Sequence, residues 1–204
     1  MIRLPFVESD DVAEAVEIGV AAVAKGGVVL LPTESYYGLG CDPWSKAGVE
    51  RVFSIKDRPS ELGLPVLCSD WKQLESLVVV PEAYRTKLSR LWPAALTVVL
   101  PTVVDIPAAQ KGTLAVRIPG HTELRALLYG VGPLTGTSAN RHGDPPVTTI
   151  GAALASLVEN PDVALDAGST AGGEVSTLVD LSQGKPEVIR PGSCDWEEVY
   201  PDGF

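Results

Sequence analysis

Residues 28–40 read Val28-Val-Leu-Leu-Pro-Thr-Glu-Ser-Tyr-Tyr-Gly-Leu-Gly40, and this stretch indicates the fold class most directly. Its first four residues are apolar and β-branched at the start, which is typical of a buried strand. The residues that follow predict a loop beyond the carboxyl end of that strand, where open α/β sheets bind ligands. A simple polar turn, with glycines that supply positive φ, explains the same residues equally well.

The segments on both sides of this stretch alternate between helix and strand patterns. Apolar residues at helical spacing and capping residues predict helices over 9–23, 45–55, 70–77, 81–91, 122–129 (ended by Gly130), and 148–158 with Thr148 or Thr149 as its cap. Short apolar runs predict strands over 28–31, 64–68, 96–100, 114–118, 133–137, 163–166, 175–181 and 187–190. This order predicts an α/β (α+β) fold with a mixed sheet. We expect one domain over residues 1–204, with a core of about 12–192 and a short C-terminal tail.

Composition excludes several classes of protein. The chain carries 26 acidic and 16 basic residues, a net charge of −10. This charge counts against a protein whose whole surface binds nucleic acid, and it excludes neither a local basic pocket nor contact through one patch. No apolar run approaches the roughly 20 residues that span a bilayer, and the acidic N-terminal region is unlike a signal peptide. Three widely spaced cysteines (Cys41, Cys68 and Cys194) predict neither disulfides nor a zinc site. We therefore expect a reduced, cytoplasmic protein without a membrane segment.

Two basic residues follow the second predicted helix. Lys56 and Arg58 are two positions apart, so on an extended backbone their side chains point to the same side. A lysine and an arginine together can clamp a phosphate, the first as a point charge and the second as a bidentate fork. A solvated helix C-terminus explains the same two residues taken alone.

Polar residues also interrupt the later strands. Ser138 and Asn140 share alternation spacing at a strand end, where they can hold phosphate or carboxylate oxygens or form a hydroxyl-rich turn. Arg117 lies in an apolar strand and requires either an acidic partner or a ligand. The sequence contains no Gly-x-x-x-x-Gly-Lys-Ser/Thr loop, Gly-x-Gly-x-x-Gly fingerprint or Gly-x-Ser-x-Gly elbow. A nucleotide site here would therefore be of an unusual kind.

Taken together, these segments resemble the YrdC-like family, whose best-understood members are threonylcarbamoyl-AMP synthases. The resemblance extends over about residues 15–192 and rests on Leu31-Pro-Thr-Glu-Ser-Tyr-Tyr-Gly-Leu-Gly-Cys-Asp-Pro, Lys56-Asp-Arg-Pro, Leu91-Trp-Pro, Leu96-Thr-Val-Val-Leu, Leu114-Ala-Val-Arg-Ile-Pro, Thr137-Ser-Ala-Asn and Val188-Ile-Arg-Pro-Gly. It implies a twisted mixed β-sheet flanked by helices around a concave binding face. The implied activity makes threonylcarbamoyl-adenylate and pyrophosphate from L-threonine, bicarbonate and ATP. Partner proteins would pass the threonylcarbamoyl group to the adenosine next to the anticodon of tRNA.

The resemblance also implies roles for individual residues. The implied catalytic tetrad around the phosphates and the carbamate is Lys56, Arg58, Ser138 and Asn140. The residues implied to hold threonine are Thr33, Arg117, Ser138 and Ser176. Those implied to contact ATP are Lys56, Arg58, Thr113, Asn140, Thr148 and Arg190. Mg²⁺ would be bound with ATP, with phosphate oxygens and water as most of its ligands, and no protein metal site is assigned.

The sequence departs from the usual family pattern at a few positions. Ser35 and Tyr36 replace a more usual Thr-Val pair, Leu64 stands where many relatives have His, and His142 stands where Ser is common. One alternative to a synthase is an RNA-binding module, because the family's concave face has been taken for a double-stranded RNA or tRNA surface. The other is a paralogue with a different substrate or none. For a synthase, the resemblance implies at most a weak contact with tRNA. The negative charge disfavours the first alternative.

Overall fold

A computed structural model of the chain describes residues 1–59 and 63–197. These residues form six helices: α1 (Ser9–Val23), α2 (Lys46–Lys56), α3 (Trp71–Glu75), α4 (Glu82–Leu91), α5 (Thr122–Val131) and α6 (Ile150–Ser156). They also form the strands β1 (Ile2–Pro5), β2 (Val29–Pro32), β3 (Tyr37–Gly40), β4 (Val66–Leu67), β5 (Leu96–Pro101), β6 (Thr113–Arg117), β7 (Leu134–Thr135), β8 (Thr137–Ser138), β9 (Val163–Asp166), β10 (Thr177–Asp180) and β11 (Glu187–Arg190). No helix within these two ranges is long and apolar enough to cross a membrane.

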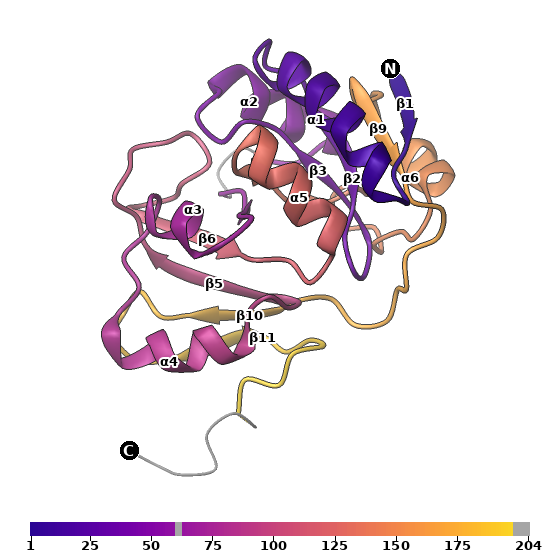
Figure 1. The fold of residues 1–204 in the computed structure, drawn as a ribbon. Coiled ribbons are helices and arrows are strands. Elements are labelled where there is room, and N and C mark those ends of the chain that lie inside the picture. The colour runs from indigo at the N-terminus through magenta and orange to yellow at the C-terminus, as the bar shows by residue number, and fades with distance from the viewer. Residues whose placement is uncertain (60–62, 198–204) are drawn as a thin grey trace.

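The strands are divided between two mixed sheets (Figure 1). The first sheet has the order β1-β9-β2-β3-β8, with parallel pairs at β1-β9-β2 and antiparallel pairs beyond. The second has the order β11-β10-β5-β6-β4-β7 and alternates between antiparallel and parallel pairs. The predicted α/β fold with mixed strand directions is confirmed, and its strands are distributed over two sheets rather than one.

The predicted loop after β2 is in part a strand. After the turn at residues 33–36, β3 returns antiparallel to β2, with Leu31 opposite Gly38. Gly40 has no positive φ, contrary to the turn interpretation. A Cβ at Gly40 would lie 2.8 Å from the Thr135 carbonyl oxygen and 2.9 Å from Leu31 Cδ2. This glycine is therefore needed because another strand approaches its backbone closely.

The predicted strand over 133–137 is two short strands that belong to different sheets. β7 pairs with β4 in the second sheet, and β8 pairs with β3 in the first. Gly136 separates them, and a Cβ there would lie 2.4 Å from Leu67 Cγ. The segment is therefore a direct connection between the two sheets.

The helix α5 ends at Val131, two residues later than predicted. Gly130 stays helical, and Gly132, at φ 99°, follows the last turn of α5. A Cβ at Gly130 would lie 2.7 Å from Val16 Cγ1 of α1. Gly130 therefore allows α1 and α5 to pack closely, and it does not cap the helix.

The ordered core is larger than the predicted range of 12–192. Residues 2–5 form β1 on the edge of the first sheet, parallel to β9. Near the other end, Trp196 is 5% exposed and has the Lys87 ammonium 4.1 Å from its ring centroid. The remainder of the predicted tail, residues 198–204, lies outside the described residues.

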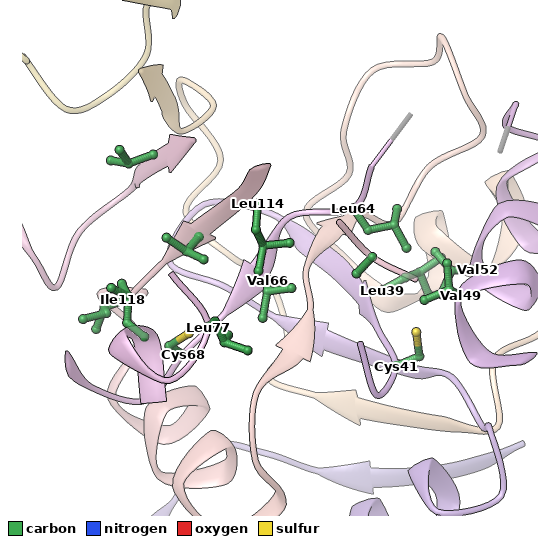
Figure 2. Packing of buried hydrophobic residues seen from close by; sticks show 14 of the residues in the cluster. Leu39, Cys41, Val49, Val52, Leu64, Val66, Cys68, Leu77, Leu114 and Ile118 are labelled. Atoms are coloured by element: carbon green, nitrogen blue, oxygen red, sulfur yellow. The ribbon is translucent and has the colours of Figure 1, made fainter. Parts of the chain in front are cut away.

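Two apolar clusters hold the elements together. One joins side chains of both sheets with α2, α3 and α6, and Figure 2 shows several of its members, including Leu39 of β3, Val49 of α2 and Val66 of β4. The other packs α1 and α5 against the first sheet through residues such as Ala15 and Leu127. The first cluster includes side chains of β3 from the first sheet and of β5 and β6 from the second. It therefore packs the two sheets against each other.

Candidate active site

A cavity of about 510 Å³ lies between the two sheets. Residues from the β2–β3 turn, β5, β6, β8 and the segment before β10 line it. Of the described lining residues, three are arginines (Arg58, Arg117 and Arg190) and one is a carboxylate, Asp144. In a chain with a net charge of −10, this cavity is a local cationic site.

Arg58 reaches the cavity from just beyond α2. Asp57 adopts a left-handed conformation at φ 50°, so Lys56 and Arg58 do not share the extended backbone assumed from their spacing. The guanidinium of Arg58 donates hydrogen bonds to Thr137 Oγ1 at 3.2 Å and to the Gly63 carbonyl at 3.3 Å. Its buried Nε has no hydrogen-bond partner among the described residues. Arg58 therefore retains donor capacity for a ligand.

Lys56 lies behind the cavity wall. Its side chain is buried, and its Nζ donates to the carbonyl oxygens of Ser138 and of Asn140, the latter at 2.6 Å. Burial, with a smaller contribution from the Arg58 charge, lowers the pKa of Lys56 to about 8. In this conformation Lys56 holds the turn that carries Ser138 and Asn140.

Ser138 and Asn140 both line the cavity. Asn140 is 5% exposed, and its Nδ2 donates to the Arg141 carbonyl at 2.9 Å and to the Asp144 carbonyl at 2.7 Å. Its Oδ1 is buried, and no described residue donates a hydrogen bond to it. A buried amide oxygen without a donor is costly, so a ligand that donates to it would stabilise the site.

Arg117 has an acidic partner, which is one of the two alternatives that the sequence left open. It lines the cavity, and its NH2 forms an ion pair with Glu34 Oε1 at 2.6 Å, on the side of the β2–β3 turn. The same carboxylate oxygen accepts a hydrogen bond from the Gly120 amide at 2.9 Å. Burial would raise the pKa of Glu34, but Arg117 and these hydrogen bonds outweigh it and hold that pKa below its usual value. The arginine is thus held in position.

Ser176 and Arg190 form a third polar group in the cavity lining. The Arg190 guanidinium donates to Ser176 Oγ at 3.1 Å and to the Ser176 carbonyl at 2.8 Å. Ser176 Oγ also lies 3.1 Å from Thr97 Oγ1, and burial lowers the pKa of Arg190. Sequence analysis did not single out Thr97, although a polar residue inside an apolar strand was the signal that identified Arg117.

Of the three other predicted site residues, one lines the cavity and two do not. Thr33 lines the cavity, but its hydroxyl donates to the Tyr36 carbonyl at 2.7 Å within the β2–β3 turn. Thr113 and Thr148 are outside the lining formed by the described residues. Thr113 Oγ1 donates to the Gln110 carbonyl at 2.9 Å, and Thr149 rather than Thr148 caps α6. Their predicted contacts with ATP remain predictions.

Comparison with known proteins identifies the family. The family model Sua5_yciO_yrdC, described as telomere recombination, matches residues 21–192. The chain belongs to this family. This confirms the resemblance drawn from the motifs of the sequence.

Several members of the Sua5/YciO/YrdC family are similar along most of the chain. A protein of Pseudoalteromonas translucida named threonylcarbamoyl-AMP synthase is 35% identical over 173 residues, 81% of this chain and 92% of that protein. A Mycobacterium leprae protein that carries the same name provisionally is 34% identical over 203 residues, 94% of this chain and 91% of that protein. The crystal structure of Pyrococcus abyssi Sua5 complexed with L-threonine superposes with a TM-score of 0.89 at 30% identity. That match covers 98% of this chain and 60% of the Pyrococcus chain.

The family fold therefore brings together seven of the predicted residues around one cavity: Thr33, Arg58, Arg117, Ser138, Asn140, Ser176 and Arg190. Fixed guanidinium groups can neutralise two anions held side by side, while the hydroxyl and amide groups orient them. The arrangement suits a reaction between anionic reactants better than one that needs a strong protein nucleophile.

Proposed function

We propose that this protein is a threonylcarbamoyl-AMP synthase that acts as a nucleotidyltransferase. It takes L-threonine, bicarbonate and ATP and releases threonylcarbamoyl-adenylate and pyrophosphate. Partner proteins then transfer the threonylcarbamoyl group to tRNA. The observation that carries the proposal is the cavity with three arginines between the two sheets, in a chain whose relatives bear the synthase name.

The chemistry explains why such a cavity is useful. The threonine nitrogen and bicarbonate condense to a carbamate with loss of water. A carbamate oxygen then attacks the α-phosphorus of ATP, and the bond from that phosphorus to the bridging oxygen of the β-phosphate breaks, so that pyrophosphate leaves. Both reactants are anions that repel each other in water. Fixed positive charge and alignment are therefore the main contributions required of the protein.

The proposed roles follow the placement of the side chains. Arg117 binds the threonine carboxylate, supported from behind by Glu34. Arg58 and Arg190, which both line the cavity, neutralise the phosphates. Ser138 and Asn140 orient the carbamate, and Lys56 acts through the turn that carries them.

The donor set of the cavity fits Mg²⁺ only as an ion that arrives with ATP. No group of three or more histidine, cysteine or acidic side chains that could hold a metal occurs within residues 1–59 and 63–197. Asp144 is the carboxylate that could approach a nucleotide-bound ion directly or through water. When bound, Mg²⁺ would neutralise charge on the phosphates.

Replacing Arg58 tests the proposal. Arg58→Ala should lower the rate of pyrophosphate release from ATP, threonine and bicarbonate by about a hundredfold or more, because one oriented charge on the transition state is lost. The matched control is Arg85→Ala, which removes a surface arginine that pairs with Glu75 outside the cavity lining. The control should keep wild-type turnover. Equal turnover in both variants, or a wild-type protein that releases no pyrophosphate with these substrates, would contradict the proposal.

A further inference from the structure

The segment of residues 167–176, here called the crossover segment, carries part of the cavity wall. It leaves β9 in the first sheet and enters β10 in the second, and it is the orange chain that descends between these strands in Figure 1. Val175 and Ser176 at its end line the cavity. Because the segment joins two sheets without regular structure of its own, its position depends on the contacts along its length.

Those contacts come from the β2–β3 turn, from Tyr37 at the start of β3 and from Thr148 before α6. The Tyr37 hydroxyl donates to the Gly168 carbonyl at 2.9 Å, and the Gly172 amide donates to the Ser35 carbonyl at 2.8 Å. The last contact before the cavity is a hydrogen bond from the Tyr36 hydroxyl to the Gly173 carbonyl. Gly173 has a φ of 88°, a conformation that glycine adopts without strain.

The turn is itself a firm support. Thr33 Oγ1 donates to the Tyr36 carbonyl at 2.7 Å and accepts from the amides of Ser35 at 3.3 Å and Tyr36 at 3.2 Å. At the other end of the crossover segment, Arg190 and Thr97 hold the Ser176 hydroxyl. The four residues from Gly173 to Ser176 are therefore held at both ends, by Tyr36 at Gly173 and by Arg190 and Thr97 at Ser176.

We propose that Tyr36 is a positioning residue whose hydroxyl latches the crossover segment and so places Ser176 for the amino-acid substrate. The role in substrate binding rests on the proposed function, whereas the latch itself does not. Tyr36 also lines the cavity, so the latch lies at the edge of the ligand space. Because the latch already holds this part of the wall in place, ligand binding does not have to order it. The latch therefore strengthens binding and takes no part in the chemical step.

The test removes the hydroxyl alone. In Tyr36→Phe, the amides of Thr170 and Gly172, which donate to the Thr148 and Ser35 carbonyls, should exchange with deuterium faster than in the wild type without any substrate present. The KM for threonine should rise about fivefold, the change that corresponds to the usual net value of one hydrogen bond, while kcat stays within about twofold.

The chain offers a matched control. The Tyr84 hydroxyl also donates to a glycine carbonyl, that of Gly184 at 3.3 Å, and Tyr84 lies outside the cavity lining of the described residues. Tyr84→Phe should leave both the exchange of the crossover segment and the KM unchanged. A second variant, Gly173→Ala, disturbs the same contact from the other side because its φ of 88° strains alanine, and it should reproduce the Tyr36→Phe result.

The outcomes separate the two proposals. Unchanged exchange of Thr170 and Gly172 in Tyr36→Phe overturns the latch, whatever the activity. Faster exchange with an unchanged KM, or a loss confined to kcat, overturns the positioning role. If the wild-type protein makes no pyrophosphate from threonine, bicarbonate and ATP, the proposed function fails, and the exchange experiment still decides whether Tyr36 holds the segment.

Discussion

Among single residues, Lys56 combines deep burial with a positive charge. It is 2% exposed, and its ammonium donates to two backbone carbonyl oxygens and to no described carboxylate. Burial therefore lowers its pKa from 10.5 to about 8. The lysine supplies hydrogen-bond donors to the Ser138 and Asn140 carbonyl oxygens, which would otherwise lack these donors inside the protein.

The lowered pKa predicts how stability depends on pH. Between about pH 8 and 10.5 the unfolded chain holds the Lys56 proton and the folded chain releases it, so this group makes folding more favourable as the pH rises. From pH 7.5 to 9.5, the free energy of unfolding of the wild type should rise by roughly 1 to 2 kcal/mol relative to Lys56→Met. Urea denaturation of both proteins at the two pH values measures this difference. A difference that is constant or falls with pH would be inconsistent with a depressed pKa.

At the level of elements, two glycines allow neighbouring strands to pack closely, and so they determine where the strands lie. Gly40 admits the Thr135 carbonyl between β3 and β7, and Gly136 admits Leu67 where the chain changes sheets. Gly136 lines the cavity with Thr137, Ser138 and Asn140, and Gly40 packs against the Thr135 carbonyl immediately before this stretch. The geometry of the site thus depends on the small size of these two glycines.

Replacing Gly40 predicts a loss of stability. Gly40→Ala places a Cβ 2.8 Å from a backbone oxygen that cannot move without shifting β7, so the free energy of unfolding should fall by roughly 2 kcal/mol. Gly151→Ala is the control, because nothing lies within 4 Å of its added Cβ in α6 and it should raise stability by about 0.5 kcal/mol. Chemical denaturation at one temperature compares the two. A Gly40→Ala protein as stable as the wild type would mean that β7 moves away without cost.

For the whole molecule, the distribution of charge separates small anions from polyanions. The chain has a net charge of −10, whereas the cavity collects three arginines and one described carboxylate. ATP can enter this local positive region, but a long RNA must also approach the acidic surface around it.

The charge distribution predicts weak binding of tRNA by this protein alone. At about 0.15 M salt, the dissociation constant for tRNA should be roughly 0.1 mM or weaker, the range of non-specific contacts. Filter binding over a series of salt concentrations measures it, with ATP turnover assayed on the same preparation. Tight, salt-sensitive capture of tRNA without ATP turnover would instead favour an RNA-binding module.

The sequence alone determined the α/β class, most helices and strands, and the polar residues that follow the strands. These features depend on local patterns: apolar periodicity, capping residues such as Asp70, and polar residues within apolar runs. The motif from Thr137 to Asn140 and the Lys56–Arg58 pair also carried the family resemblance, which the family match confirms.

Only the tertiary structure decided how these pieces meet. The division into two sheets depends on Gly136, whose small size matters because Leu67, far away in the sequence, packs against it. The ion pair of Glu34 with Arg117 and the latch between Tyr36 and Gly173 join residues 83 and 137 positions apart. Such contacts leave no periodic pattern in the sequence, because they arise from packing between elements rather than from the local preferences of the chain.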